Sequence, residues 1–334
     1  MKTLMHNGLI VLDHPAFDRI YGSEHKIRIA RRVNLLAEPM SKEEVLKRPD
    51  LLAQVDVIFS GWGAPLMDEA FMKMAPNLKA VFYGAGTIRH FTTDAFWDRK
   101  VAITSAYAMN AVPVAEYTLA AVLLSLKNFW KHAHAAKQNG AYAERVPCAG
   151  AYGSKVGLIS LGMIGRLVRE RLRPFDLDVL AYDPFVTPEQ ATVLGVEMVS
   201  LEDIFKRCDV VSLHTPWLKE TEGMIRGAHF EMMKPNSTFL NTARGAVVNE
   251  PEMISVLQKR PDLVAWLDVT YPEPPVQDSP LWTLPNVVLT PHIAGSQNAE
   301  CQRMGRLMID EFDRWSRGEG LKWGISREKA ALLA

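Results

Sequence analysis

The stretch "VGLISLGMIGRLV", Val156–Val168, predicts a buried strand that leads directly into a helix. Its first residues are apolar or small, which is typical of a strand covered on both faces. After the turn, Ile164, Leu167 and Val168 repeat at helical spacing and give the helix one apolar side. The backbone N–H groups at such a helix start favour an anion, so this stretch predicts the pyrophosphate site of a dinucleotide-binding fold.

The residues of this turn have separate roles. Gly162 lets a phosphate approach the backbone, and Gly165 lets the helix pack closely on the strand. Ser160 occupies the first glycine position of the usual motif, which costs little at negative φ and up to about a few kcal/mol at positive φ. Asp183 ends the next predicted strand, where a carboxylate suits a ribose 2′-hydroxyl and repels a 2′-phosphate. The sequence therefore predicts NAD rather than NADP; the alternative is a tight strand–helix turn that binds no ligand.

Strands and helices alternate after Lys155, which predicts βαβ units and a parallel sheet. In such a sheet, ligands bind beyond the carboxyl ends of the strands. The predicted strands are residues 156–161, 178–182, 209–214, 237–243, 263–269 and 286–291, and the predicted helices are residues 164–173, 200–207 and 251–260.

The first hundred residues carry three further strand-like stretches, at 55–61, 78–86 and 101–106. Ser41 predicts one helix start by its spacing from a glutamate, and Pro65 predicts another. The expected fold class is therefore α/β throughout.

Two long helices are also expected. One continuous helix over residues 112–139 has Pro113 near its start and Gly140 just past its end, and it would cross between domains. An amphipathic helix is expected over residues 298–318.

Composition narrows the class of protein. The chain has 334 residues, 48% of them hydrophobic, which allows about two domains. Lys and Arg number 38, as do Asp and Glu, so no charged footprint for nucleic acid or an anionic membrane is present. The three cysteines, Cys148, Cys208 and Cys301, form no paired motif and favour a reducing compartment. We expect a soluble cytoplasmic protein without a signal peptide, a membrane span or a metal site.

Three side chains at or beyond predicted strand ends suit hydride transfer between an alcohol carbon and a nicotinamide. The stretches "NTARGAVVNE", "LDVTYPEPP" and "LTPHIAGS" supply Arg244, Glu273 and His292. An imidazole serves as acid and base near neutral pH, and a carboxylate orients it and stabilises its protonated form. A guanidinium can hold a substrate carboxylate and polarise a carbonyl. Taken singly, each residue has another reading: a loop ion pair for Arg244, a solvated carboxylate for Glu273 and a turn histidine for His292.

The ordered motifs "LGMIGR", "YDP", "LHTP", "NTARG", "LDV", "PEP" and "TPHIAG" resemble the D-isomer-specific 2-hydroxyacid dehydrogenases. The resemblance implies two Rossmann-like domains with parallel sheets. The NAD-binding domain, residues 112–294, would be inserted into a substrate domain formed by residues 1–111 and 295–334.

The resemblance also implies roles for single residues. Arg244 would bind the substrate, Glu273 would be the partner of His292, and His292 would be the acid/base. Asp268 would contact the nicotinamide carboxamide. The full set of implied cofactor-binding residues is Gly162, Met163, Ile164, Gly165, Asp183, His214, Thr215, Pro216, Thr242, Ala243, Arg244, Asp268, His292 and Gly295.

Some positions depart from the family pattern, and some suggest a substrate site. Met163 stands where a basic residue often lies near the pyrophosphate; Arg166 could compensate, although a helix surface favours a solvated side chain. The resemblance implies that the loop Gly84, Ala85, Gly86 offers backbone N–H groups to a substrate carboxylate, and its glycines would permit an anion nest. The alternative is a structural turn. Arg89 could read a phosphate or a second carboxylate.

The expected function is NAD-dependent interconversion of a D-2-hydroxy acid and its 2-keto acid, with a glyoxylate-, hydroxypyruvate- or phosphoglycerate-like substrate. An alternative from another class is an NAD(H)-sensing, corepressor-like binding protein with little turnover. A formate-type dehydrogenase is disfavoured, because formate oxidation has no hydroxyl proton for a His292–Glu273 pair to remove. By resemblance we expect a homodimer that uses residues 112–155, and neither nucleic acid nor a membrane as a partner.

Overall fold

The computed structural model describes residues 5–142 and 144–332, which divide into two compact units. Unit 1 comprises residues 1–110 and 296–334, and unit 2 comprises residues 111–295. Each boundary differs by one residue from the expected one. Each unit is built on a parallel sheet, so the α/β fold class predicted from the sequence is confirmed.

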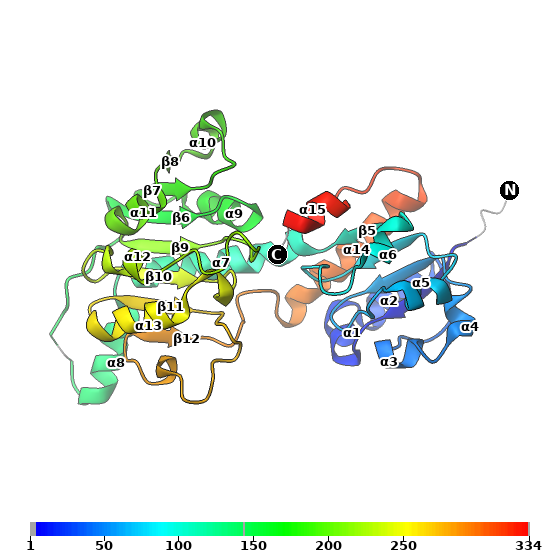
Figure 1. Ribbon diagram of the computed structural model, residues 1–334, viewed down its shortest axis with the longest axis horizontal. Helices are drawn as coiled ribbons and strands as arrows, with labels where there is room; N and C mark the ends of the chain where they lie inside the picture. Colours follow the sequence, from blue (N-terminus) through cyan, green and yellow to red (C-terminus); the bar gives the residue numbers. More distant parts are fainter. Residues whose placement is uncertain (1–4, 143, 333–334) are drawn as a thin grey trace. The chain divides into compact units, whose positions relative to one another are not determined.

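Unit 2 contains a seven-stranded parallel sheet in the order β12-β11-β10-β9-β6-β7-β8, which Figure 1 shows from one edge to the other. The chain proceeds outward from β6 to β8 and then returns to β9, so the strand order reverses between β6 and β9. Open α/β sheets bind ligands at such a reversal. The strands are β6 (Ser154–Ile159), β7 (Leu177–Tyr182), β8 (Glu197–Met198), β9 (Val210–Leu213), β10 (Thr238–Asn241), β11 (Val264–Leu267) and β12 (Val287–Leu289).

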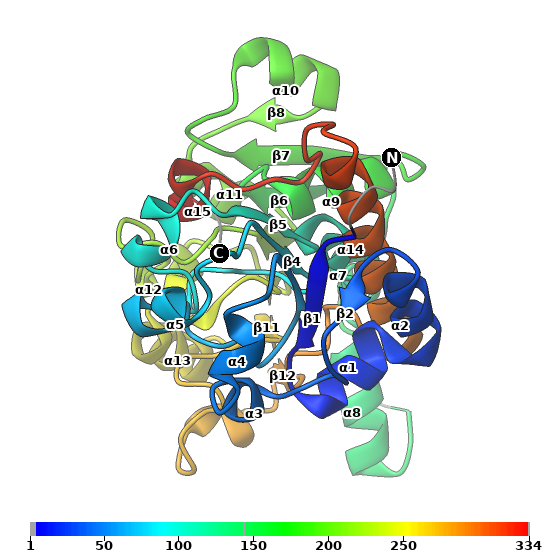
Figure 2. The same ribbon diagram turned by 90° about the vertical axis from the view of Figure 1, so that its right-hand side faces the viewer.

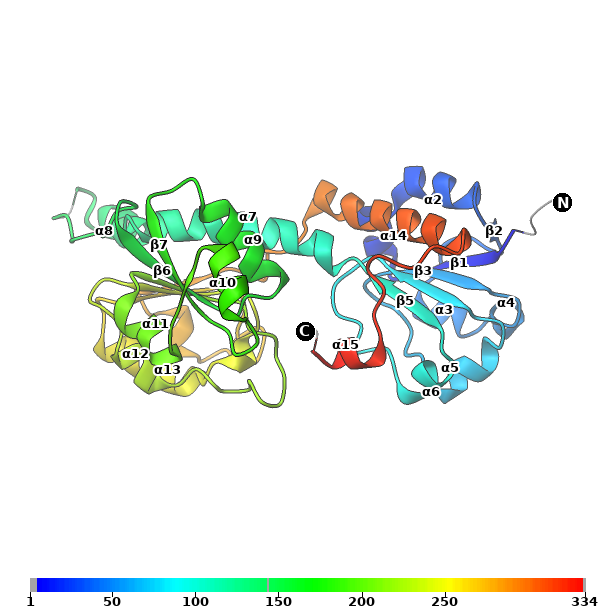
Figure 3. The same ribbon diagram turned by 90° about the horizontal axis from the view of Figure 1, so that it is seen from above.

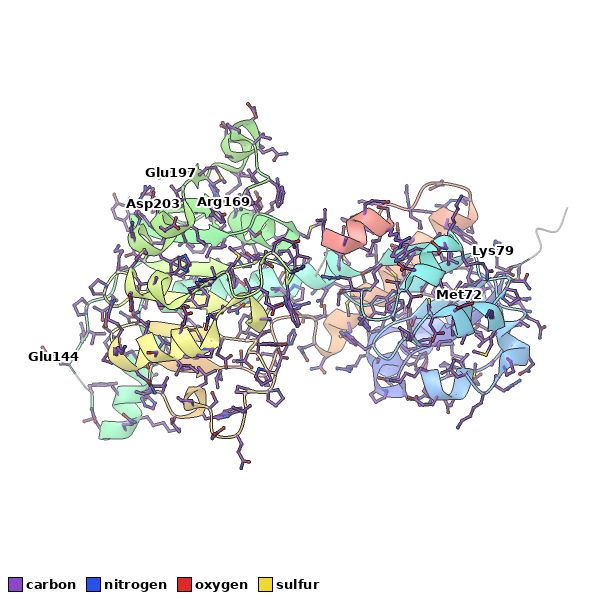
Figure 4. All side chains as sticks on the ribbon, in the orientation of Figure 1. Met72, Lys79, Glu144, Arg169, Glu197 and Asp203 are labelled. Carbon is purple, nitrogen blue, oxygen red and sulfur yellow. The ribbon has the colours of Figure 1, made fainter. Side chains whose placement is uncertain are left out.

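Helices cover both faces of this sheet, which is why its strands are apolar on both sides. One face packs against α7, α8 and α9, and the other against α11, α12 and α13 (Figure 3). The guanidinium of Arg169 donates to the carbonyl oxygen of Gly195 at 2.9 Å and ties α9 to the turn before β8 (Figure 4). The helices of this part are α7 (Tyr107–Ser125), α8 (Phe129–Asn139), α9 (Met163–Leu172), α10 (Pro188–Leu194), α11 (Leu201–Arg207), α12 (Gly227–Glu231) and α13 (Glu250–Lys259).

The prediction of one helix over residues 112–139 was wrong. The chain forms α7 and α8 instead, separated by Asn128 at φ +48°, a left-handed conformation that ends one helix before the next begins. Pro113 lies inside α7 rather than near its start, because the helix already begins at Tyr107.

Helix α7 bears on the expectation that the chain has no membrane span. Of the described helices, α7 alone is long and apolar enough to cross a membrane, with 19 residues and a mean hydropathy of 1.3. Half of its most apolar 18 residues are buried. Ala115, Ala121 and Val122 belong to the core on one face of the unit 2 sheet. A core helix of a globular protein meets the same criterion, so the match is weak support for a span.

Unit 1 contains a five-stranded parallel sheet in the order β2-β1-β3-β4-β5, and Figure 2 shows β1 and β2 side by side at one edge. α1, α2 and α14 cover one face, and α3 to α6 with α15 cover the other (Figure 3). The strands are β1 (Asn7–Val11), β2 (Asn34–Leu35), β3 (Val57–Ser60), β4 (Ala80–Tyr83) and β5 (Ala102–Ser105). The helices are α1 (His14–Ile20), α2 (Gly22–Ala30), α3 (Lys42–Val45), α4 (Pro49–Leu52), α5 (Glu69–Met74), α6 (Asp94–Asp98), α14 (Cys301–Ser316) and α15 (Arg327–Leu332).

The two helix starts that the sequence predicts in unit 1 have different outcomes. Ser41 and Glu44 form the expected reciprocal capping box at the start of α3. Pro65 does not begin a helix; α5 begins at Glu69, where the Asp68 carboxylate accepts the N–H of Phe71 at 2.9 Å.

Candidate functional site

The implied cofactor and catalytic residues of unit 2 lie at one edge of its sheet. Parallel strands end at the same edge, and each of these residues follows the carboxyl end of a strand. Gly162 follows β6, Asp183 follows β7, His214, Thr215 and Pro216 follow β9, Thr242, Ala243 and Arg244 follow β10, Asp268 follows β11, and His292 and Gly295 follow β12.

The glycine turn after β6 has the geometry of a phosphate-binding turn. Gly162 is the N-cap of α9, and a Cβ there would have no heavy atom within 4 Å, so the backbone is open on that side. A Cβ on Gly165 would lie 2.2 Å from the carbonyl oxygen of Ser160, so α9 packs too closely on the turn for any side chain. The Asp183 carboxylate accepts the N–H of Leu161 at 2.7 Å and that of Phe185 at 2.8 Å, which fixes the turn as well as offering charge.

Ser160 adopts φ +77°. This left-handed backbone conformation has the lowest steric cost for glycine, which is the usual residue at this position of the motif. We expect Ser160→Gly to raise the free energy of unfolding by about 1 kcal/mol relative to Ser160→Ala, because alanine keeps the strained β-carbon and glycine removes it. Urea unfolding of the two variants measures the difference. Equal stability would show that the left-handed residue carries no strain.

Arg166 of α9 is not a freely solvated side chain. Its Nε donates to the carbonyl oxygen of Leu161 at 2.7 Å, so the guanidinium is tied to the glycine turn. Met163 supplies no charge to the turn, and Arg166 is the nearby cation that could do so.

His214 and Thr215 follow β9, beside the glycine turn. The His214 ring carbon Cδ2 lies 3.7 Å from the position of a Cβ on Gly165. His214 Nε2 and the Ser212 hydroxyl share a hydrogen bond of 3.0 Å, whereas His214 Nδ1 and the Thr215 hydroxyl are buried without a partner among the described residues. Buried polar atoms without partners are uncommon, and these two fit a site that a polar ligand completes.

Burial lowers the pKa of His214 to about 4, from 6.5 for a free side chain. Its contribution to stability is therefore present above pH 6.5 and is lost as the pH falls toward 4, because the unfolded chain takes up the proton first. Between pH 7 and pH 5 we expect the wild-type protein to lose about 2 kcal/mol more than His214→Asn. Urea unfolding at the two pH values tests this, and parallel losses in both proteins would contradict it.

The acid/base candidates form a direct pair. His292 Nδ1 lies 2.7 Å from the Glu273 Oε1 atom, and both side chains are about half exposed. Burial lowers the pKa of the Arg244 guanidinium, and the charge of Glu273 opposes that shift. The Arg244 Nη1 atom donates to the carbonyl oxygen of Ala243 at 2.6 Å, and within the described ranges no carboxylate forms an ion pair with Arg244. Its charge is thus available to an anionic ligand.

The backbone around these residues is tightly fixed. His292 has φ +53°, a conformation uncommon for histidine, and its N–H donates to the carbonyl oxygens of Asp268 and Thr290. A Cβ on Gly245, just after Arg244, would lie 2.0 Å from the carbonyl carbon of Thr270, so only glycine fits there.

The residues that match a known family model span 119–294, and the model describes the NAD binding domain of D-isomer specific 2-hydroxyacid dehydrogenases. The chain belongs to this family. The resemblance noted from the sequence motifs is therefore confirmed, and so is NAD as the cofactor.

Similar proteins extend the comparison. The chain is 34% identical to a D-3-phosphoglycerate dehydrogenase of Mycobacterium leprae over 72% of this chain and 45% of that protein. It is 29% identical to one from Archaeoglobus fulgidus over 89% of this chain and 56% of that protein. The chain thus spans about half the length of the curated relatives it matches. A crystal structure of a D-isomer specific 2-hydroxyacid dehydrogenase from Lactobacillus delbrueckii, in its NAD complexed form, is similar in fold, with a TM-score of 0.78, 20% identity and coverage of 96% and 100% of the two chains.

The loop Gly84, Ala85, Gly86, which the sequence resemblance implies for the substrate, lies in unit 1 after β4. The Ser105 hydroxyl holds this loop by contacting the carbonyl oxygens of Ala85, at 2.8 Å, and Gly86. Among the described residues, neither Ala85 nor Gly86 donates its N–H to a backbone carbonyl. Gly84 and Gly86 both lack a positive φ, so the alternating left-handed residue of an anion nest is missing. Any anion binding here would depend on free N–H groups of a simple turn.

Sequence analysis does not single out two residues that support the candidate site, Thr290 and Tyr117. Thr290 is two residues before His292, and its hydroxyl donates to Asp268 Oδ1 at 2.6 Å. Tyr117 lies on α7, and no local pattern connects it to residue 290.

Proposed function

We propose that this chain is an NAD-dependent oxidoreductase that interconverts a D-2-hydroxy acid and its 2-keto acid. The observation that carries the proposal is the 2.7 Å contact between His292 and Glu273 beyond the carboxyl ends of the strands that follow the glycine turn. Family membership and the NAD-binding match support it.

The tautomer of His292 follows from its partner. A carboxylate only accepts hydrogen bonds, so Nδ1 carries the hydrogen toward Glu273 and Nε2 presents its lone pair. In the oxidation direction, Nε2 takes the proton from the substrate hydroxyl, and the Glu273 carboxylate stabilises the imidazolium. A bound NAD would supply the acceptor for the hydride on the carbon that bears this hydroxyl. In the reverse direction, His292 returns the proton to the carbonyl oxygen.

Arg244 orients the substrate. Its guanidinium has five donors and no carboxylate partner in the described part of the chain, so it can bind the carboxylate of a 2-keto acid and polarise the adjacent carbonyl. Within unit 1, the N–H groups of Ala85 and Gly86 donate to no backbone carbonyl among the described residues, so they are candidates to bind an anion.

We propose a phosphoglycerate-like substrate first, with glyoxylate or hydroxypyruvate as alternatives, because the matched relatives include D-3-phosphoglycerate dehydrogenases. The test is oxidation of NADH with a panel of 2-keto acids that includes 3-phosphohydroxypyruvate, hydroxypyruvate and glyoxylate. We expect turnover with at least one of them. NADH binding without turnover of any member would reject the proposal and favour a sensing protein.

A further inference from the structure

A chain of side-chain hydrogen bonds runs from helix α7 to the loop that carries His292. Trp266 Nε1 lies 2.9 Å from the Tyr117 hydroxyl, which lies 2.8 Å from the Thr290 hydroxyl. The Thr290 hydroxyl lies 2.6 Å from Asp268 Oδ1. We call these four residues the Thr290 relay.

The direction of each hydrogen bond in the Thr290 relay is fixed by chemistry. An indole nitrogen only donates, and an ionised carboxylate only accepts. Trp266 therefore donates to Tyr117, Thr290 uses its single hydrogen on Asp268, and Tyr117 must donate to Thr290. A chain in which every hydroxyl is both donor and acceptor strengthens each of its bonds.

Asp268, the last residue of the Thr290 relay, fixes the backbone at and after His292. The Asp268 side chain is buried, and besides Thr290 it accepts the N–H groups of Ile293 and Ala294, each at 2.9 Å. Its own carbonyl oxygen accepts the N–H of His292 at 3.0 Å. A left-handed histidine persists only where the surrounding contacts determine it, and Asp268 supplies these contacts from both sides of the residue.

We propose that Thr290 and Tyr117 are positioning residues for His292. The relay joins the rigid helix α7 to Asp268, and Asp268 holds the strained turn that aims the imidazole. This inference rests on the proposed acid/base role of His292, but the relay itself can be tested without turnover.

Thr290→Val keeps the shape of the side chain and removes the hydroxyl. We expect it to reduce kcat by about 10-fold, because the histidine loses its alignment. Thr290→Ser, which keeps the hydroxyl, should restore kcat to within about twofold of wild type. Thr192→Val is the matched control, since the Thr192 hydroxyl donates to the Pro188 carbonyl on α10 at 2.9 Å.

Tyr117→Phe removes only the outer link and should lower kcat less than Thr290→Val does. Since Tyr117 reaches Asp268 only through Thr290, adding Tyr117→Phe to Thr290→Val should produce no further loss. Fully multiplicative losses in the double variant would overturn the relay.

Amide hydrogen exchange separates this inference from the proposed function. In Thr290→Val, the Ile293 and Ala294 amides should exchange about 10-fold faster, whether or not any 2-keto acid is turned over. Unchanged exchange and unchanged kcat would overturn the inference. Faster exchange with unchanged kcat would also overturn it, because the loop would then move without consequence for His292. If Thr290→Ser loses as much activity as Thr290→Val, the hydroxyl is not the group that matters and the inference fails.

Discussion

Replacing His292 with glutamine is expected to lower kcat for the 2-keto acid by about 10³-fold and to leave the affinity for NADH within about twofold. General acid/base catalysis contributes about 10²- to 10⁴-fold, and glutamine fills a similar volume without a group that titrates near neutral pH. Glu273→Gln should also lower kcat, because the imidazole loses the charge that stabilises its protonated form. Single-turnover rates and NADH fluorescence titrations measure the two quantities.

A second histidine–glutamate pair provides the control for this experiment. His14 Nε2 lies 3.0 Å from Glu44 Oε2 at the start of α3, and both side chains are exposed. His14→Gln removes an equivalent contact within unit 1, so kcat should remain at the wild-type value. Wild-type turnover in His292→Gln would remove His292 from the mechanism; an equal loss in both variants would indicate a general effect of histidine replacement.

Gly165→Ala is expected to destabilise the protein by about 3 kcal/mol and to abolish measurable NADH binding. Its methyl group would lie 2.2 Å from the Ser160 carbonyl oxygen, a backbone atom that cannot move without displacing the whole glycine turn. Thermal unfolding and NADH titration measure the two effects.

The matched variant is Gly162→Ala, the same chemical change three residues earlier. A methyl group at Gly162 meets no heavy atom within 4 Å, and φ there is −70°, so the unfolding temperature should be unchanged. NADH affinity should still fall, since the methyl group lies where a phosphate approaches the backbone. Equal stability of the two variants would contradict the close packing of α9 on the turn.

Local patterns predict the nucleotide-binding half of this fold well, because its central strands, such as β6, β9 and β10, are apolar and almost completely buried. The strand and helix around Gly162 appear within a few residues of their predicted limits. The break between α7 and α8 is different, since the surrounding residues all favour a helix and only the left-handed Asn128 interrupts it. Pro65 likewise has the residue type of a helix start, but the Asp68 cap determines where α5 begins.

The candidate site is likewise predictable from the sequence only in part. Arg244, Glu273 and His292 are recognisable because their motifs occur in a characteristic order, and the structure brings His292 and Glu273 into contact. The Thr290 relay cannot be read from the sequence, since Tyr117 and Thr290 are 173 residues apart and meet only in the folded sheet. Side chains that support a reactive group are chosen by packing, and packing leaves no local signature.

The two backbone amides held by Asp183 bear on any attempt to change the coenzyme preference of this chain from NADH to NADPH. Exchanging the carboxylate for a neutral or basic group would remove the repulsion of a 2′-phosphate, but it would also remove the carboxylate that accepts the N–H groups of Leu161 and Phe185. Such a redesign would therefore need a replacement, for example an asparagine whose amide oxygen still accepts one of these bonds, before altered coenzyme preference could be separated from a loosened binding loop.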